Sequence, residues 1–163
     1  KAWRKSPPEG REGVTPAHVA ARLGHSGCLE KVVFAGATLD ATDPAGDNVA
    51  HICSYQADGA LLKALSNSKT ASAACNQRNG DGKTPLELVS SVSSVDEGQM
   101  KDAVEALLSN GADPNAAFSD GSSAIHASCA ALEPTIVAVL LSKGADCSLE
   151  RASDKAVPIQ VAL

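Results

Sequence analysis

A short phrase that begins with Gly and leads into a capping residue recurs four times, and it constrains the fold more than any other feature. It reads Gly-Val-Thr-Pro-Ala-His at residues 13–18, and related versions begin at Gly46, Gly82 and Gly121. Successive glycines of the phrase are separated by 33, 36 and 39 residues. A period of this length is typical of a solenoid, in which each unit buries its apolar face only by stacking on its neighbours.

The first unit shows why the phrase predicts two helices. Thr15 can cap a helix with its hydroxyl, and Pro16 suits the first helical position because its missing N–H needs no partner there. Gly24 suits the left-handed stop of this first helix. Apolar residues spaced along residues 28–35 then predict a second helix, which ends at Gly36. The unit is therefore expected to be a pair of antiparallel helices followed by an exposed turn.

The other units keep the physical role of each position while the residues change. The capping position holds Asn48, Thr84 and Ser123. Gly-Ala-Asp ends the second helix at residues 111–113 and 144–146. These residues resemble the ankyrin-repeat family, whose signature is Thr-Pro-Leu-His followed by paired helices. The resemblance implies an all-α fold: an ankyrin-repeat solenoid of stacked helix-turn-helix units with projecting β-turn or hairpin fingers.

The repeat boundaries divide the chain into a flank and one ankyrin-repeat domain. Residues 1–12 are expected to be an N-terminal flank or cap, and residues 13–163 the domain. Its units are expected at about 13–45, 46–81, 82–120 and 121–154, with a partial fifth at 155–163. Because the chain begins at Lys1 rather than Met, it is a candidate fragment of a longer protein.

Two stretches depart from the repeat. The third unit carries about six extra residues between its helices, within residues 90–99. One explanation is a tolerated surface loop, and the other is a partner contact or a phosphorylated serine cluster. The candidate contact residues are Ser93, Ser94, Asp96 and Glu97. The second unit lacks a Gly-Ala-Asp turn over residues 66–81, which predicts an irregular turn or marks a subfamily.

Composition excludes several classes of function. A net charge of −5 and an aromatic content of 2% provide neither a basic surface nor stacking platforms for nucleic acid. Five widely spaced cysteines lack the spacing of a zinc site, and they fit a reduced protein without a bound metal. The sequence also shows no membrane span and no signal peptide. We therefore expect a cytoplasmic or nuclear domain that needs no cofactor and is monomeric by itself.

Histidine is the obvious candidate for catalysis. His18, His51 and His126 occupy the same position in their units, which predicts a structural role in hydrogen bonds between neighbouring turns. Cys53 and Cys129 follow two of these histidines closely, but both fall on small helices that should be packed, so inert thiols are expected. The sequence predicts no enzyme.

Partner-binding residues are expected where the copies differ, which is in the projecting turns. The candidates are Asp40, Asp43, Asp47, Arg78, Asp81, Lys83, Phe118, Asp120, Glu150 and Arg151. Phe118 has two interpretations, an exposed aromatic that anchors an interface or a ring that packs against the next finger. Charge reversal at Asp43 and Asp47 is expected to weaken partner binding and to leave the thermal midpoint nearly unchanged.

Within the ankyrin-repeat family, three stretches look like the inhibitor-of-κB group and the C-terminal halves of NF-κB precursors. They are residues 43–51, the lengthened turn before residues 79–82, and residues 121–128 together with 144–149. This likeness implies a non-enzymatic clamp on a Rel-type transcription factor dimer, which masks localisation or DNA-binding surfaces. The insertion at 90–99 departs from the common pattern, and no phosphodegron is present in this sequence.

Three alternatives remain open at this point. The chain could be a generic adaptor, such as a substrate receptor of a ubiquitin ligase or a scaffold. It could be the recognition module of a larger catalytic or channel protein. It could also be a cyclin-dependent-kinase inhibitor, although its turn sequences look less like those of that group.

Overall fold

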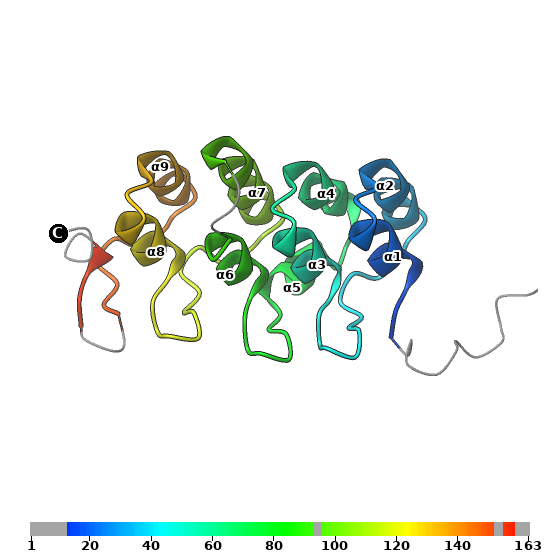
Figure 1. The fold of residues 1–163 in the computed structure, drawn as a ribbon, viewed down its shortest axis with the longest axis horizontal. Helices are drawn as coiled ribbons and strands as arrows, with labels where there is room; N and C mark the ends of the chain where they lie inside the picture. The colour runs from blue at the N-terminus through cyan, green and yellow to red at the C-terminus, as the bar shows by residue number, and fades with distance from the viewer. Residues whose placement is uncertain (1–12, 93–95, 152–154, 159–163) are drawn as a thin grey trace, which may run out of the picture.

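Two parallel rows of helices, with turns projecting from one side, make up the molecule in Figure 1. The structure is a computed structural model that describes residues 13–92, 96–151 and 155–158. The inner row, next to the turns, contains α1 (Pro16–Arg22), α3 (Val49–Tyr55), α6 (Pro85–Ser90) and α8 (Ala124–Ala130). The outer row contains α2 (Ser26–Phe34), α4 (Gly59–Lys63), α7 (Glu97–Ser109) and α9 (Pro134–Ser142). All regular elements within the described ranges are helical, which confirms the expected all-α solenoid.

The inner helices begin where the capping residues predict. Thr15 Oγ1 accepts a hydrogen bond from His18 N at 3.5 Å. Asn48 Oδ1 accepts from His51 N at 3.1 Å, and α6 repeats this arrangement at its own cap. Such caps satisfy backbone N–H groups that have no partner inside the helix. Ser123 differs, because its hydroxyl contacts the His126 ring instead of capping the backbone.

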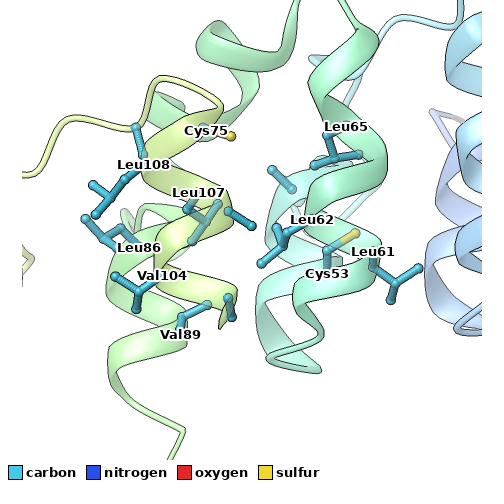
Figure 2. Packing of buried hydrophobic residues seen from close by; sticks show 14 of the residues in the cluster. Cys53, Leu61, Leu62, Leu65, Cys75, Leu86, Val89, Val104, Leu107 and Leu108 are labelled. Carbon is cyan, nitrogen blue, oxygen red and sulfur yellow. The ribbon is translucent and has the colours of Figure 1, made fainter. Parts of the chain in front are cut away.

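The hydrophobic core lies between the two rows. Leu61, Leu62, Leu65 and Leu107 are completely buried. In Figure 2, Leu62 and Leu107 lie between the helix pairs of the second and third units, whereas Leu61 points toward the first unit. Each such side chain contributes roughly 1.5–3 kcal/mol through the apolar surface it removes from water. The four helix pairs therefore share one continuous core instead of forming separate domains.

Gly59 is required at a close contact between the second and third units. A Cβ atom at this buried position would lie 2.8 Å from the Cβ of Asp102 on α7. Any side chain at residue 59 would push α4 and α7 apart, so glycine sets the spacing of the outer row here.

The insertion in the third unit mostly lengthens a helix. Helix α7 has 13 residues, whereas α2 and α9 have 9 each and end at the same distance from the glycine that follows them. The additional residues are 97–100, and Asp96 caps them by accepting a hydrogen bond from Gly98 N at 3.1 Å. Asp96 and Glu97 are exposed, whereas Ser93 and Ser94 lie outside the described residues.

The irregular stretch of the second unit forms two further short helices. These are η1 (Ala64–Asn67) and α5 (Ala71–Asn76), which replace the Gly-Ala-Asp turn. Thr70 Oγ1 accepts a hydrogen bond from Leu39 N of the first unit at 3.0 Å. Asn76 Nδ2 donates to Gly111 O of the third unit at 2.7 Å. The stretch is thus a folded connection between both neighbouring units.

Candidate functional site

Four turns project from the inner row and carry most of the sequence-predicted site residues (Figure 1). We refer to them as finger 1 (residues 40–47), finger 2 (76–83), finger 3 (115–122) and finger 4 (149–151 with 155–157). Two backbone hydrogen bonds close finger 1, from Asp43 N to Asp47 O and from Gly46 N to Asp43 O, each 2.9 Å long. Fingers 2 and 3 repeat both bonds. We call the surface between the fingers and the inner helices the finger groove.

Asp43 builds finger 1 and is not free to meet a partner. Only 6% of the residue is exposed. Its Oδ1 accepts hydrogen bonds from Ala45 N at 2.9 Å and Asp47 N at 3.0 Å, while Oδ2 pairs with Arg22. Charge reversal would place a buried cation beside Arg22 and remove both turn bonds. The expectation that such a change spares folding stability is therefore corrected for Asp43.

Asp47 joins finger 1 to finger 2. Its Oδ1 accepts a hydrogen bond from Asn79 Nδ2 at 2.8 Å. Beside this contact, Gly80 N donates to Ala45 O at 3.2 Å. A Cβ on Gly46 would lie 2.5 Å from Gly80 N, so the two backbones meet without room for a side chain. Asp47 is half-buried as a result.

The remaining charged candidates are more accessible. The exposed ones are Asp40, Arg78, Asp81, Asp120 and Glu150, while Lys83 and Arg151 are half-buried. Arg78 links fingers 2 and 3, since its guanidinium donates to Gly82 O and Ala117 O at 2.6 Å each. Hydrogen bonds from the hydroxyl and N–H of Ser122 hold the pKa of Asp120 below its usual range, and Arg151 contributes in the same direction.

Phe118 is a core residue, which corrects its assignment as a partner-binding residue. It is 7% exposed and belongs to the hydrophobic cluster, so it is not the exposed aromatic that an interface anchor requires. It stands at the position that Asp43 and Asn79 occupy in fingers 1 and 2. Because a phenyl ring cannot accept the turn hydrogen bonds, Asp120 Oδ1 accepts one from Ser122 N at 2.8 Å instead.

Two of the repeated histidines, His51 and His126, link their inner helix to the next finger. His51 Nε2 donates to Lys83 O at 3.1 Å, and His126 Nε2 donates to Ala156 O at the same distance. A carbonyl oxygen only accepts, so Nε2 carries the proton. His51 Nδ1 accepts from Asn48 N at 3.2 Å, and burial lowers the pKa of this ring. Both contacts confirm the predicted bonds between neighbouring turns for His51 and His126, whereas the buried Nε2 of His18 has no hydrogen-bond partner among the described residues.

Glu87 occupies the histidine position in the third unit. It is 7% exposed, and both carboxylate oxygens lie 3.2 Å from Ser119 N, which donates to them. Ser119 Oγ also donates to Oε1. Glu87 therefore also links α6 to finger 3. Here the helix provides the hydrogen-bond acceptor and the finger provides the donor.

A cavity of about 380 Å³ opens in the finger groove beside Glu87, and we call it the hollow. Small side chains cause it. Ala127 and Ala130 of α8 stand four and seven residues after the cap, where α3 carries Ile52 and Tyr55. Other residues that line the hollow are Lys83, Ser91, Ser122 and Arg151.

Apolar residues of the finger groove were missed by the sequence analysis. Val19 and Leu23 at α1 are 47% and 62% exposed, and Tyr55 of α3 is 47% exposed. A second cavity of about 560 Å³ is lined by Val19, Leu23 and residues of finger 1. Their distance in sequence from the capping residue could have identified these residues. Val19 follows Thr15 by four residues, and Tyr55 follows Asn48 by seven.

The described residues show no arrangement suited to catalysis. Burial raises the pKa of the Cys75 thiol to about 12 and raises that of Cys53 as well, so neither is a reactive thiolate. No group of three metal-ligating side chains occurs in the described ranges. None of the helices found there has the length and apolar character needed to cross a bilayer.

Comparison with known proteins identifies one repeat family. The family model described as ankyrin repeats (3 copies) matches residues 17–117 and 50–151. The chain is 30% identical over 141 residues to neurogenic locus notch homolog protein 1 of Danio rerio, covering 86% of this chain and 5% of that protein. It is 25% identical over 150 residues to the nuclear factor NF-kappa-B p105 subunit of Gallus gallus, covering 91% of this chain and 14% of that protein.

A bacterial relative shares a shorter segment. Protein PhlB of Serratia liquefaciens is 38% identical over 65 residues, which is 40% of this chain and 29% of PhlB. The chain thus spans less than a third of the length of each of these relatives.

Proposed function

Because this chain belongs to the ankyrin-repeat family, whose repeats form protein-interaction domains, we propose that it is a non-enzymatic regulator that binds a Rel/NF-κB-type transcription factor. The observation that supports this partner is the similarity to the NF-kappa-B p105 subunit, which extends over 91% of the chain. The three stretches that look like the inhibitor-of-κB group lie within this aligned length.

The finger groove has the properties of a protein-binding surface. It exposes Val19, Leu23 and Tyr55 along two adjacent inner helices. The exposed carboxylates of Asp40 and Asp81 lie on the fingers beside them. Exposed apolar side chains bordered by charged residues are typical of interfaces, where aromatic residues often carry much of the binding energy. A partner segment with apolar and basic residues fits this surface.

The proposed setting is the cytoplasm, the nucleus or both, where such transcription factors act. Binding by a monomer is sufficient, because the cavities of the finger groove are lined by residues of a single chain. No cofactor or nucleic acid takes part in the proposed interaction.

A second candidate function is that of a recognition module within a larger protein. The match to a notch homolog favours it, since the aligned part is only 5% of that protein. The two candidates differ in partner and agree on the use of the finger groove.

Direct binding of the purified domain to a purified Rel-type dimer tests the proposed partner. We expect a dissociation constant below roughly 1 μM, as for a specific interface of ordinary size. Leu23→Ser and Tyr55→Ser should each weaken binding by roughly tenfold or more, as for interface anchors. Phe34→Ser is the matched control, because Phe34 is 84% exposed on α2 in the outer row and lies away from the groove.

Two results would contradict the proposal. Absence of binding at micromolar concentration excludes a Rel-type partner. Equal weakening by Phe34→Ser and Leu23→Ser excludes the finger groove as the binding surface.

A further inference from the structure

Glu87 differs in chemistry from the residues at the same position in the other units. His18, His51 and His126 occupy this position elsewhere, and the last two donate a hydrogen bond to the carbonyl of the next finger. A carboxylate accepts hydrogen bonds and has none to donate when ionised. The third unit therefore presents an acceptor where the second and fourth units present a donor.

The carboxylate of Glu87 is buried without a cationic partner. Its hydrogen bonds within the described residues come from Ser119 alone. The ion pair that the described ranges contain joins Arg22 to Asp43, at the other end of the solenoid. Buried charges are normally paired, because removing an ion from water is costly. Lys83 and Arg151 line the same hollow, but no ion pair to Glu87 is found among the described residues, so its carboxylate has capacity for a further positively charged group.

A second acceptor lies on the same hollow. Ser122 O is the counterpart of Lys83 O in finger 2, which accepts from both a backbone N–H and the His51 ring. In finger 3, Phe118 N donates to Ser122 O at 2.7 Å, but Glu87 cannot supply the second donor. A ligand with several donors can satisfy both groups at once.

We propose that the hollow binds an arginine side chain of a partner polypeptide, with its guanidinium group on the Glu87 carboxylate. The proposal rests on the protein-binding role above and not on the identity of the partner. Guanidinium has five donors in a planar fork that matches a carboxylate, and it is less strongly hydrated than the ammonium of lysine. The volume of about 380 Å³ is sufficient for one such side chain.

The other charges around the hollow determine how strongly arginine binds. Asp120 and Arg151 line the hollow with opposite charges, so their contributions to its net charge cancel. Lys83 is a cation of this chain that lines the hollow, and it repels a second positive charge. Lys83→Gln should therefore strengthen arginine binding, whereas loss of the Glu87 charge should weaken it. Opposite changes in affinity for these two variants would show that the hollow recognises the charge of arginine and not only its shape.

A titration with blocked tripeptides tests the proposal. The probes are acetyl-Gly-Arg-Gly-amide, the lysine peptide, and the citrulline peptide, whose side chain has nearly the same shape but no charge. NMR of the ¹⁵N-labelled chain should show shifts at the Ser119 and Ser122 amides with the arginine peptide, saturating in the millimolar range expected for so small a ligand. The lysine peptide should bind several-fold more weakly, and the citrulline peptide should cause no comparable shifts.

Two variants separate binding from folding. Glu87→Gln should weaken arginine binding at least tenfold, while Glu30→Gln removes an exposed charge from α2 and should leave binding unchanged. If Glu87→Gln lowers the thermal midpoint, Ala130→Leu provides the independent test, because it fills the hollow from an exposed position without touching Glu87.

Several outcomes would overturn the proposal. They are equal binding of the citrulline or lysine peptide, unchanged binding by Ala130→Leu, and no shift at roughly 20 mM arginine peptide, a concentration at which even small ligands are detected. Failure to bind a Rel-type dimer would leave this result intact, because the peptides test the hollow directly.

Discussion

The junction between fingers 1 and 2 is closed, whereas the junction between fingers 2 and 3 opens into a hollow. In the first, Gly80 N donates to Ala45 O and the two backbones meet at Gly46. In the second, the Arg78 side chain provides the link to finger 3, and a cavity of about 380 Å³ remains beside Glu87. The same helix-turn-helix unit thus produces two different surfaces.

Three positions account for the difference. His51 is replaced by Glu87, the polar turn residue Asn79 by Phe118, and the bulky Tyr55 at the end of α3 by Ser91 at the end of α6. The repeated phrase therefore builds the unit, while side chains at a few positions in and beside it decide whether neighbouring units close or leave a cavity.

The largest effect is expected at the glycine of the closed junction. Gly46 has a φ of +81°, and a Cβ there would lie 2.5 Å from Gly80 N. We expect Gly46→Ala to reduce the free energy of unfolding by roughly 3–4 kcal/mol, from backbone strain and the displacement of finger 2. Gly82 has a similar φ of +77° but no neighbour within 4 Å. Gly82→Ala should cost only about 1 kcal/mol in the same urea titration. Equal losses would show that the fingers do not meet.

The next effect concerns the helix caps. Asn48 caps α3 and also donates from Nδ2 to Ala74 O at 2.9 Å, so Asn48→Ala leaves buried partners unsatisfied. We expect a loss of about 2–3 kcal/mol. Thr84→Ala at the matching position removes only the cap of α6 and should cost about 1 kcal/mol. Chemical denaturation measures both, and a larger loss for Thr84→Ala would reverse the comparison.

A smaller effect is the pH dependence of the closed junction. Burial lowers the pKa values of His51 and His18, so the unfolded chain binds more protons than the folded one just below the ordinary histidine pKa of about 6.5. The free energy of unfolding should therefore fall as pH decreases through that window, by at most about 1.4 kcal/mol per pH unit for each ring.

His51→Gln tests this origin. It should make the decline between about pH 7.5 and about pH 5.5 shallower, because one of the two shifted groups is gone. His25→Gln is the control, since His25 is exposed. An unchanged slope in His51→Gln would exclude the ring as the cause.

The smallest effect is expected in the hollow. Ala130 is exposed, so Ala130→Leu should change stability by no more than about 0.5 kcal/mol. Ala50 of α3 is completely buried, and Ala50→Leu should cost about 1–3 kcal/mol through overpacking. Thermal unfolding of both variants compares an open surface with a packed one. A large loss for Ala130→Leu would mean that the hollow is filled in solution.

The repeat pattern was sufficient to predict the fold, because its residues act on backbone groups close to them in the sequence. Thr15 and Asn48 cap the helices that follow them, and His51 and His126 at the third helical position form the links that were expected. Such roles depend on residue type and spacing, both of which the sequence displays. The extent of the helical solenoid was therefore predictable before any tertiary contact was known.

The site was less predictable because burial depends on the neighbouring unit. Asp43 looks like a free surface charge until Arg22 and the finger 1 backbone are placed around it. The hollow results from several small side chains on different units, and Ala127 carries no functional signal by itself. The sequence showed that residues 66–81 depart from the repeat, but it did not predict the two short helices found there.

Helix α5 extends the cooperativity of the molecule. In an ordinary solenoid, stability is close to a sum of separate interfaces between adjacent units. Thr70 and Asn76, at the two ends of this short segment, bond to the first and the third unit respectively. Opening α5 would release two interfaces in one event, so the first three units should melt as a single block and not one after another.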